Sequence, residues 1–471
     1  MPLILPGNVG SATASTTYNV ANSARFDDGS SDNLQRTYGT PTNAKIFALS
    51  WWIKLGKAWD GSGSQDFWGE RAGSGDRVFM GINADGTFEY FEKDGGSTVL
   101  NIKTNRLFRD NSAWYHFLLL GDSTQGTASN RLKLYVNGVQ ETSFATESYP
   151  AEDYVFRLAI NTVKYFGRIG LGGSLSTNYY DGYLCEAVFV DGNVTAHTDY
   201  GEFDSDSPTI WKPKDVSGLT FGNNGFYLDF EDSSALGNDV SGNDNDFTVN
   251  NLTAVDQSID SCTNNFATLN PLYTNDGAIT YSQGNLKAAA GSGSTSWTTR
   301  YAFSTIGVSA GRWYVEGKCV DSGGSNQFYF GIAKDLESWS FNSSLGYEDT
   351  GQGWGYYANN GNIINNQSDL YTSGNSYTDG DIISMELDLE DMTLDFYKNG
   401  VKEGYQITSL PAGTYHFAIN GYQAIDGEFN FGSPPHSISS GNADGNGHGN
   451  FEYSVPSGHF ALCTKNLAEY G

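Results

Sequence analysis

The chain has 471 residues, of which 54 are acidic and 26 basic, giving a net charge of −28 at pH 7. This charge argues against nucleic acids and anionic membranes as partners, because both require basic surface on the protein. No run of about 18 apolar residues occurs, and residues 1–7 lack a basic region and a long apolar stretch, so we expect neither membrane insertion nor a secretory signal.

The composition and the spacing of apolar residues predict an all-β protein. Glycine accounts for 58 residues and aromatic side chains for 14% of the chain, which favours strands joined by tight turns. Runs of five to eight residues alternate in polarity and end in Gly, Asn, Asp or Ser. No clear helical period accompanies them, and this spacing is typical of antiparallel sandwiches or jelly rolls.

In chain order, we expect a tail at 1–17, a first sandwich at 18–230, a polar linker at 231–275, a second sandwich at 276–432 and a tail at 433–471. Two similar segments, 132–139 and 394–401, indicate the tandem. Each places Asn-Gly between two strands, as a two-residue hairpin turn requires. Because residues 460–463 are apolar, we expect the end of the last tail to dock on other residues.

The strand motifs of the two units resemble two known families. Residues 50–54 (SWWIK), 114–116 (WYH), 134–138 (LYVNG) and 181–184 (DGYL) resemble the laminin-G-like branch of the concanavalin A-like superfamily. Residues 354–356 (WGY), 379–383 (DGDII), 387–389 (LDL) and 394–400 (LDFYKNG) resemble a SPRY domain. Both resemblances imply antiparallel sandwiches of concanavalin A-like topology.

The whole arrangement is also similar to a group of tailed-phage virion proteins. The shared segments are 2–7 (PLILPG), 227–230 (YLDF), 237–243 (GNDVSGN), 264–271 (NNFATLNP) and 461–467 (ALCTKNL). This resemblance implies a virion protein, made in the host cytoplasm and exposed on the particle as a fibre, appendage or adhesin. We expect its N-terminal tail, up to about residue 22, to attach to the particle.

One string invites a catalytic interpretation. Residues 386–390 (ELDLE) place Glu386 and Asp388 on one face of a strand, as the acid pair of a concanavalin A-like glucanase requires. The alternative is that 390–393 forms a turn inside the SPRY motif and that neither carboxylate is catalytic. The six histidines show no metal-binding spacing, and we expect His116 to be a hydrogen-bonded core or rim residue.

No cofactor is certain from the sequence, and two acidic loops make calcium a candidate. The first loop offers Asp27, Asp28 and Asp32, and the second offers Asp239 and Asp244 beside asparagine carbonyls. Calcium binds six to eight such oxygens, although acidic turns are also commonly just solvated. The four cysteines are scattered without a CxxC pair, so we expect buried free thiols.

Exposed aromatic rings beside polar loops would bind sugars. The candidates are Trp59 and Trp68 in the first unit and Trp339 and Tyr347 in the second, because aromatic faces stack on apolar sugar surfaces. We expect Trp51, Trp114, Trp313 and Trp354 to be core residues instead.

Three functions remain open at this point. The first is a non-enzymatic tail-fibre or surface adhesin that binds a host-surface glycan or protein. The second is a capsid or tail decoration or connector that binds other virion proteins. The third is a glycan depolymerase using Glu386 and Asp388. A homo-oligomer is expected and a trimer is possible, built without a coiled coil because the chain has no heptad seam.

Overall fold

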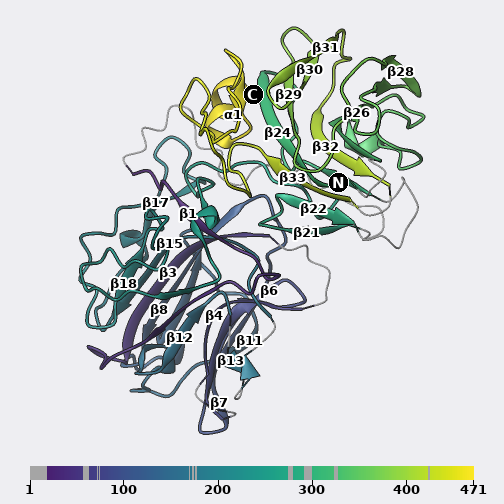
Figure 1. Ribbon diagram of the computed structural model, residues 1–471. Helices are drawn as coiled ribbons and strands as arrows, with labels where there is room; N and C mark the ends of the chain where they lie inside the picture. The colour runs from purple at the N-terminus through teal and green to yellow at the C-terminus, as the bar shows by residue number, and fades with distance from the viewer. Residues whose placement is uncertain are drawn as a thin grey trace. The chain divides into compact units, whose positions relative to one another are not determined.

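The computed structural model describes residues 18–56, 63–71, 73, 75–168, 170–171, 174–175, 178–273, 279–290, 300–322, 327–422 and 425–471. This part of the chain divides between Thr263 and Asn264 into two compact units (Figure 1). Both are built almost entirely of antiparallel sheets, as the sequence predicts. Among the described helices, none has the length and apolar character needed to cross a membrane.

The first unit is a sandwich of two eight-stranded sheets. The first sheet has the order β10-β9-β8-β3-β15-β1-β20, with β18 also paired to β15. Its strands are β10 (Val139–Gln140), β9 (Leu132–Val136), β8 (Trp114–Asp122), β3 (Ile46–Leu55), β15 (Gly182–Asp191), β1 (Ser23–Phe26), β20 (Gln257–Ser258) and β18 (Phe226–Leu228).

The second sheet of this unit has the order β11-β7-β6-β5-β4-β12-β2-β19. Its strands are β11 (Phe144–Ser148), β7 (Ser97–Leu107), β6 (Thr87–Asp94), β5 (Arg77–Ile82), β4 (Gln65–Arg71), β12 (Val163–Phe166), β2 (Asn33–Thr37) and β19 (Thr248–Asn250). Two short ribbons join β13 (Gly170–Leu171) to β14 (Ser174–Leu175) and β16 (Gly201–Phe203) to β17 (Trp211–Pro213). The 3-10 turns are η1 (Ala128–Asn130), η2 (Arg157–Ala159), η3 (His197–Asp199) and η4 (Ala254–Asp256).

Strand β3 is buried on both faces, because a further layer of the chain covers the outer face of the first sheet. Phe47, Leu49 and Trp51 alternate into the core between the sheets, as period-two geometry requires. Ala48 and Trp52 point to the outer face and are also buried. Residues 192–225, which we call the first cover, bury this outer face, for example with Tyr200, Val216 and Phe221.

The expected linker at 231–275 is wrong, because both of its halves fold into sandwiches. Residues 248–258 contribute β19 and β20 to the two sheets of the first unit. Its acidic side chains form buried ion pairs, Asp260 with Lys54 at 2.8 Å and Asp256 with Arg25 at 3.3 Å. Residues 264–273 belong to the second unit, where Leu269 bridges to Ser304. The acidic residues of this polar segment therefore form buried ion pairs and do not make it a solvated linker.

The second unit is a sandwich of an eight-stranded and a six-stranded sheet. The larger has the order β21-β22-β33-β24-β29-β30-β31, with β34 paired to β24. Its strands are β21 (Thr280–Ser282), β22 (Lys287–Ala290), β33 (Ile425–Asn430), β24 (Arg312–Asp321), β29 (Ile382–Asp388), β30 (Thr393–Lys398), β31 (Val401–Ile407) and β34 (Phe460–Ala461).

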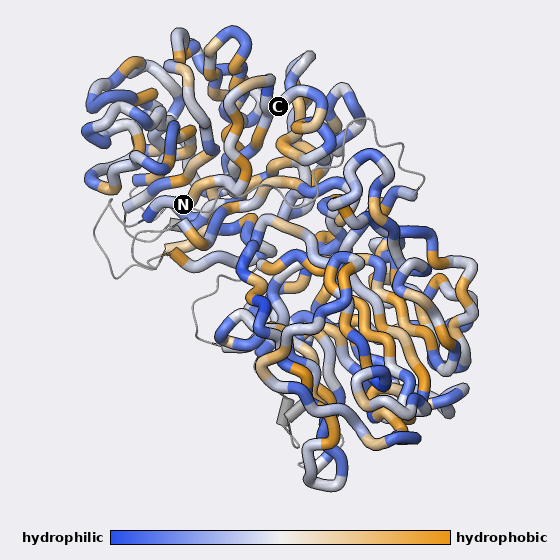
Figure 2. Tube along the Cα trace, turned by 180° about the vertical axis from the view of Figure 1, so that it is seen from behind, coloured by the Kyte–Doolittle hydropathy of each residue, from blue (hydrophilic) through white to orange (hydrophobic). Residues whose placement is uncertain are grey.

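The smaller sheet has the order β23-β32-β25-β26-β27-β28. Its strands are β23 (Tyr301–Phe303), β32 (Tyr415–Gly421), β25 (Phe328–Lys334), β26 (Gly353–Tyr357), β27 (Ile363–Asn365) and β28 (Ser368–Tyr371). The unit also contains η5 (Leu336–Ser338) and α1 (Thr464–Tyr470). Hydrophobic residues gather along the strands of each unit (Figure 2).

Local predictions hold in both units. Asn137-Gly138 and Asn399-Gly400 have φ of +48° and +75°, and of +48° and +78°, so each forms the expected hairpin turn with two positive φ angles. The four tryptophans predicted as core residues, Trp51, Trp114, Trp313 and Trp354, are buried. The four cysteines are buried and free, as expected.

The C-terminal segment 433–471 docks on the second unit, as its apolar end predicts, and is therefore not a tail. We call it the C-terminal cover. Its strand β34 pairs in parallel with β24, and Phe451 packs edge-on against Tyr314 with ring centroids 5.1 Å apart. Asp444 fastens the cover internally by accepting hydrogen bonds from the backbone of Ala461 and the side chain of Asn466.

Candidate functional site

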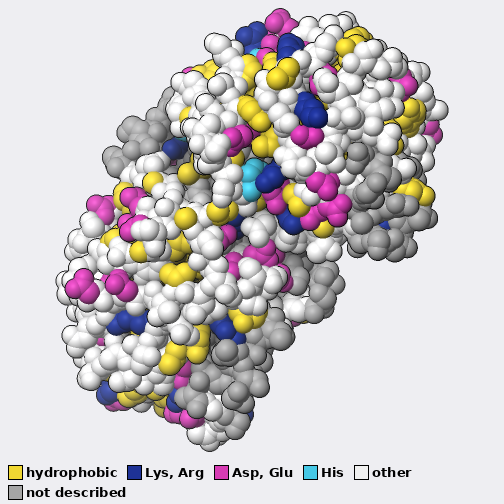
Figure 3. Space-filling model, viewed as in Figure 1, with side chains coloured by type: hydrophobic (Ala, Val, Ile, Leu, Met, Phe, Trp, Pro, Cys, Tyr) yellow, Lys and Arg dark blue, Asp and Glu magenta, His cyan; other side chains and the backbone are white. Residues whose placement is uncertain are grey.

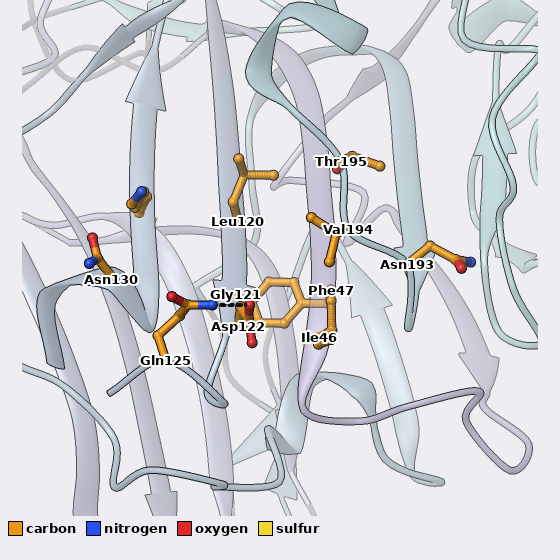
Figure 4. A pocket seen from close by; sticks show the side chains of 11 residues that line it. Ile46, Phe47, Leu120, Gly121, Asp122, Gln125, Asn130, Asn193, Val194 and Thr195 are labelled. Atoms are coloured by element: carbon orange, nitrogen blue, oxygen red, sulfur yellow. Dashed lines mark hydrogen bonds between the residues drawn. The ribbon is translucent and has the colours of Figure 1, made fainter. Parts of the chain in front are cut away.

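A pocket of about 230 Å³ opens at one end of the first sheet, beside the first cover (Figure 4). We call it the β8–β9 pocket. Its walls come from the start of β3, the end of β8, the loop and strand that follow, and residues 193–195 of the first cover. The β3–β8 and β8–β9 ladders hold the walls that come from the strands.

The floor of the pocket is apolar and depends on one glycine. Leu120, Ile46 and Val194 supply the apolar surface, and Val194 is 76% exposed. A Cβ at Gly121 would lie 2.1 Å from the ring of Phe47, which fills the core directly beneath. Gly121 thus allows the floor to approach the core closely, and a ligand ring could rest on this surface.

The rim of the pocket is polar and rich in hydrogen-bond donors. It carries Gln125, Asn130, Lys133 and Asn193, together with Asp122. Figure 4 shows Gln125 pointing back to Asp122, and its amide donates to the Asp122 carboxylate at 2.6 Å. An apolar floor with a few convergent polar groups is the usual construction of a small-ligand site.

The predicted calcium loops are only partly brought together. Asp27 and Asp28 converge with Asp181, and one oxygen from each lies within 4.8 Å of the others. Asp32 closes its own loop instead, accepting the Asp27 amide at 2.9 Å and the Ser30 hydroxyl at 2.6 Å, and burial raises its pKa to about 6. Three carboxylates are a donor set that suits Ca²⁺.

The second acidic loop is organised by hydrogen bonds within the first unit. Asp239 accepts the backbone amides of Tyr227, Ser241 and Asn245 and the Ser241 hydroxyl. Asp244 is exposed. In the part of the chain that the structure describes, neither residue joins a group of three His, Cys, Asp or Glu side chains, and a calcium site built with asparagine carbonyls stays a prediction.

The predicted sugar-binding rings have different outcomes. Trp59 lies outside the described residues. Trp68 is fully buried on β4, with its ring 4.4 Å from that of Phe166, so the prediction of an exposed platform is wrong there. Trp339 is only 8% exposed and packs against Tyr301 and Phe303, so it is a core residue too. Tyr347 is half-buried and donates to Asp369 at 3.1 Å, and its role stays a prediction.

The carboxylates of the candidate glucanase pair make structural contacts. Glu386 accepts the Tyr397 hydroxyl and lies 3.4 Å from His459 of the C-terminal cover. Asp388 accepts the amides of Glu390 and Asp391 and pairs with Arg312 at 2.8 Å. The turn after Asp388 is the one expected from the SPRY motif, and Asp388 caps it.

Sequence reasoning missed a buried carboxyl group in the first unit. Glu186 is 5% exposed, has a φ of +50° and is bonded by the hydroxyls of Tyr18 and Tyr227. Burial raises its pKa to about 8. This cluster anchors Tyr18, the first described residue, on β15. The only sequence signal was a lone glutamate in an apolar strand.

The β8–β9 pocket was missed as well, and for a different reason. Its two polar segments are of ordinary composition: Asn130 is exposed at the end of η1, and Asn193 is half-buried in the loop after β15. Nothing local distinguishes them from other turns. Only the approach of the first cover to the end of β8 makes them walls of one cavity.

Comparisons with known proteins agree with this architecture. Residues 28–198 match the concanavalin A-like lectin/glucanases superfamily, and residues 312–434 match the SPRY domain. A Ran-binding proteins 9/10 homolog of Drosophila melanogaster is 27% identical over 130 residues, which are 28% of this chain and 13% of that protein. The chain thus covers about an eighth of that relative's length.

Solved structures give matches of the same kind. The SPRY domain of human HERC1 is 22% identical, with 34% of this chain and 96% of that one covered and a TM-score of 0.29. A heptameric SAP-like pentraxin from Limulus polyphemus is 15% identical, with 39% and 82% covered and a TM-score of 0.28. From its strand order and its family matches, the chain contains a concanavalin A-like domain of the laminin-G type followed by a SPRY domain.

Proposed function

We propose that this chain is a non-enzymatic virion protein of a tailed phage, a tail fibre or surface adhesin that binds a host-surface glycan. The observation that carries the binding role is the β8–β9 pocket, where an apolar floor and a polar rim converge on a rigid sheet end. Loops on a rigid scaffold are the usual place for specificity. The virion assignment rests on the similarity of the chain's segments to tailed-phage proteins.

The surface of the described residues supports a saccharide or protein partner. Lysine and arginine side chains lie singly or in small groups over the face in Figure 3, among uncharged and acidic side chains. A nucleic-acid partner would favour a clustered basic stripe instead. The structural contacts of Glu386 and Asp388 support binding without hydrolysis, because both carboxylates already stabilise the fold.

Binding to host cells tests the proposal. A labelled full-length chain should bind cells of the phage host, and purified host polysaccharide should compete. Val194→Trp would fill the pocket mouth and abolish this binding, whereas Val401→Trp, at a 67% exposed valine of the second unit, would leave it intact. Equal binding by both variants would contradict the role of the pocket.

The virion assignment needs its own measurement. Mass spectrometry of purified particles should find this chain, and antibodies against it should decorate intact particles. A chain that is absent from particles would contradict the assignment. Tight binding to a purified capsid or tail protein without any cell binding would favour the decoration or connector role.

A further inference from the structure

The donors around the β8–β9 pocket point to the class of saccharide that it takes. We propose that the ligand is an acidic sugar, a hexuronate unit whose carboxylate pairs with Lys133. This inference rests on the proposed glycan-binding function and names the ligand class of the same site.

Lys133 is the first observation. It lies on β9, half-buried at the pocket, and forms no ion pair with another described residue. Several other lysines of the first unit are paired with acids, such as Lys54 with Asp260 at 2.8 Å and Lys164 with Glu70 at 3.1 Å. An ammonium group held at a pocket without a carboxylate partner favours an anionic ligand.

Asp122 does not fill the role of that partner. One of its carboxylate oxygens accepts the backbone amide and the hydroxyl of Thr124, at 3.1 and 2.6 Å. The other accepts the Gln125 amide at 2.6 Å. Both oxygens are therefore turned into the β8–β9 loop, and the acid contributes little acceptor capacity to the pocket.

Asn130 extends the donor set. The Asn193 amide points away from Gln125 and Asn130 in Figure 4 and donates to the Thr220 carbonyl at 2.9 Å, so Asn193 bounds the pocket without aiming its amide into it. Among the described residues, the exposed Asn130 side chain makes no hydrogen bond, while its backbone amide donates to Thr127. Hydroxyl and carboxylate oxygens of a sugar accept from such groups, while its apolar face can rest on Leu120 and Val194.

The size and charge of the pocket set further limits. A volume of about 230 Å³ is below that of typical drug-sized sites, so it suits about one sugar ring. A single lysine with no arginine among the lining residues matches one negative charge better than a phosphate dianion. A monoanionic uronate satisfies both conditions.

Calorimetry on the full-length chain tests this class. The probes are the methyl glycosides of glucuronic and galacturonic acid, each compared with its neutral glucose or galactose counterpart, which differs only at C6. We expect one acidic glycoside to bind at least about tenfold more tightly than its neutral counterpart, as one charge-assisted hydrogen bond provides. Added salt should reduce this difference.

Three variants assign the effect to the pocket. Lys133→Met should remove the preference for the acid, and Asn130→Asp should reverse it by placing a negative charge at the rim. Lys93→Met, at a half-buried lysine of β6 in the other sheet, should retain it. Each variant is checked by its circular-dichroism spectrum and thermal midpoint.

The outcomes separate this inference from the proposed function. Equal affinity for acidic and neutral glycosides, or equal loss in Lys93→Met and Lys133→Met, would overturn the acidic-sugar class. So would an absence of binding to every glycoside by a chain that still binds host cells, although the adhesin role would then survive. Uronate binding that depends on Lys133, in a chain that binds no cells, would support the ligand class and remove the adhesin role.

Discussion

The two sandwiches each hide the outer face of one sheet, but they fasten the covering segment differently. In the first unit, the first cover is held by stacked rings: Trp211 packs parallel to His116 and His197, with centroids 6.0 and 6.1 Å apart. In the second unit, the C-terminal cover is held by a buried carboxylate, since Glu316 accepts the backbone amides of Glu452 and Tyr453.

This difference shows how a covering segment can serve either packing or function. The first cover is an internal insertion between β15 and β18, which anchor both of its ends. A pocket can therefore lie at its edge while the segment stays in place. The C-terminal cover pairs with β24 through β34, bridges Cys463 to Phe266 and relies on further hydrogen bonds to Glu316. We therefore expect the loss of a packed side chain to destabilise the first cover most. The loss of a hydrogen-bond acceptor should destabilise the C-terminal cover most.

The strongest test of the comparison is Trp211→Ala. Trp211 is 1% exposed, and its loss removes the ring contacts that fasten the first cover. We expect the free energy of unfolding of the first unit to fall by about 3–5 kcal/mol in denaturant titrations. The control is Phe203→Ala, whose ring touches Trp211 but is 40% exposed. An equal, small effect of both changes would contradict the ring-stack account.

Acidification should destabilise the stack of Trp211 on His116. The Trp211 indole donates to Nδ1 of His116 at 3.0 Å, so the proton of the neutral ring lies on Nε2, facing Ser50 at 2.8 Å. Burial lowers the pKa of His116 to about 3 from 6.5, so the folded state binds fewer protons and stability is lost as pH falls below 6.5.

The expected loss is about 2 kcal/mol between pH 7 and pH 5, at about 1.4 kcal/mol per pKa unit. Unfolding curves of wild type and His116→Gln over this range measure it. The variant should be less stable at pH 7 and should show a flatter pH dependence. Parallel curves for the two proteins would rule out His116 as the titrating group.

Glu316→Ala tests the C-terminal cover. The change leaves the amides of Glu452 and Tyr453 without their acceptor, at a cost of about 1–3 kcal/mol. Hydrogen exchange at residues 452–453 should accelerate, with cleavage of the cover by protease at lower concentrations. Glu469→Ala, at an exposed glutamate of α1, serves as the control. Unchanged exchange in Glu316→Ala would show that strand pairing alone holds the cover.

The smallest expected effect concerns the carboxylates of Asp27, Asp28 and Asp181. Millimolar calcium should stabilise the first unit by about 1 kcal/mol if its affinity matches that of extracellular calcium modules. Asp28→Asn should remove this gain and should stabilise the calcium-free protein slightly, because it relieves repulsion between like charges. If calcium does not change the thermal midpoint of either protein, these three carboxylates do not bind calcium and their role is structural.

Much of the fold was predictable because it depends on local rules. Period-two alternation placed the strands, and Asn-Gly marked both hairpins, since those residues tolerate the positive φ that the turns require. The core tryptophans followed from their strand positions. The metal site stays a prediction: Asp27 and Asp28 are neighbours in sequence, whereas Asp181 reaches them only through the pairing of β1 with β15.

The sequence by itself determined the fold class, the tandem of two sandwiches, the turns and the apolar end that docks. Only the tertiary structure decided that 254–260 pairs with Arg25 and Lys54, that Trp68 is buried, and that Asn130, Lys133 and Asn193 share one pocket. The physical reason is range: alternation and φ preferences act between neighbours, whereas burial and charge pairing depend on residues far apart in the chain that meet only when the sheets close.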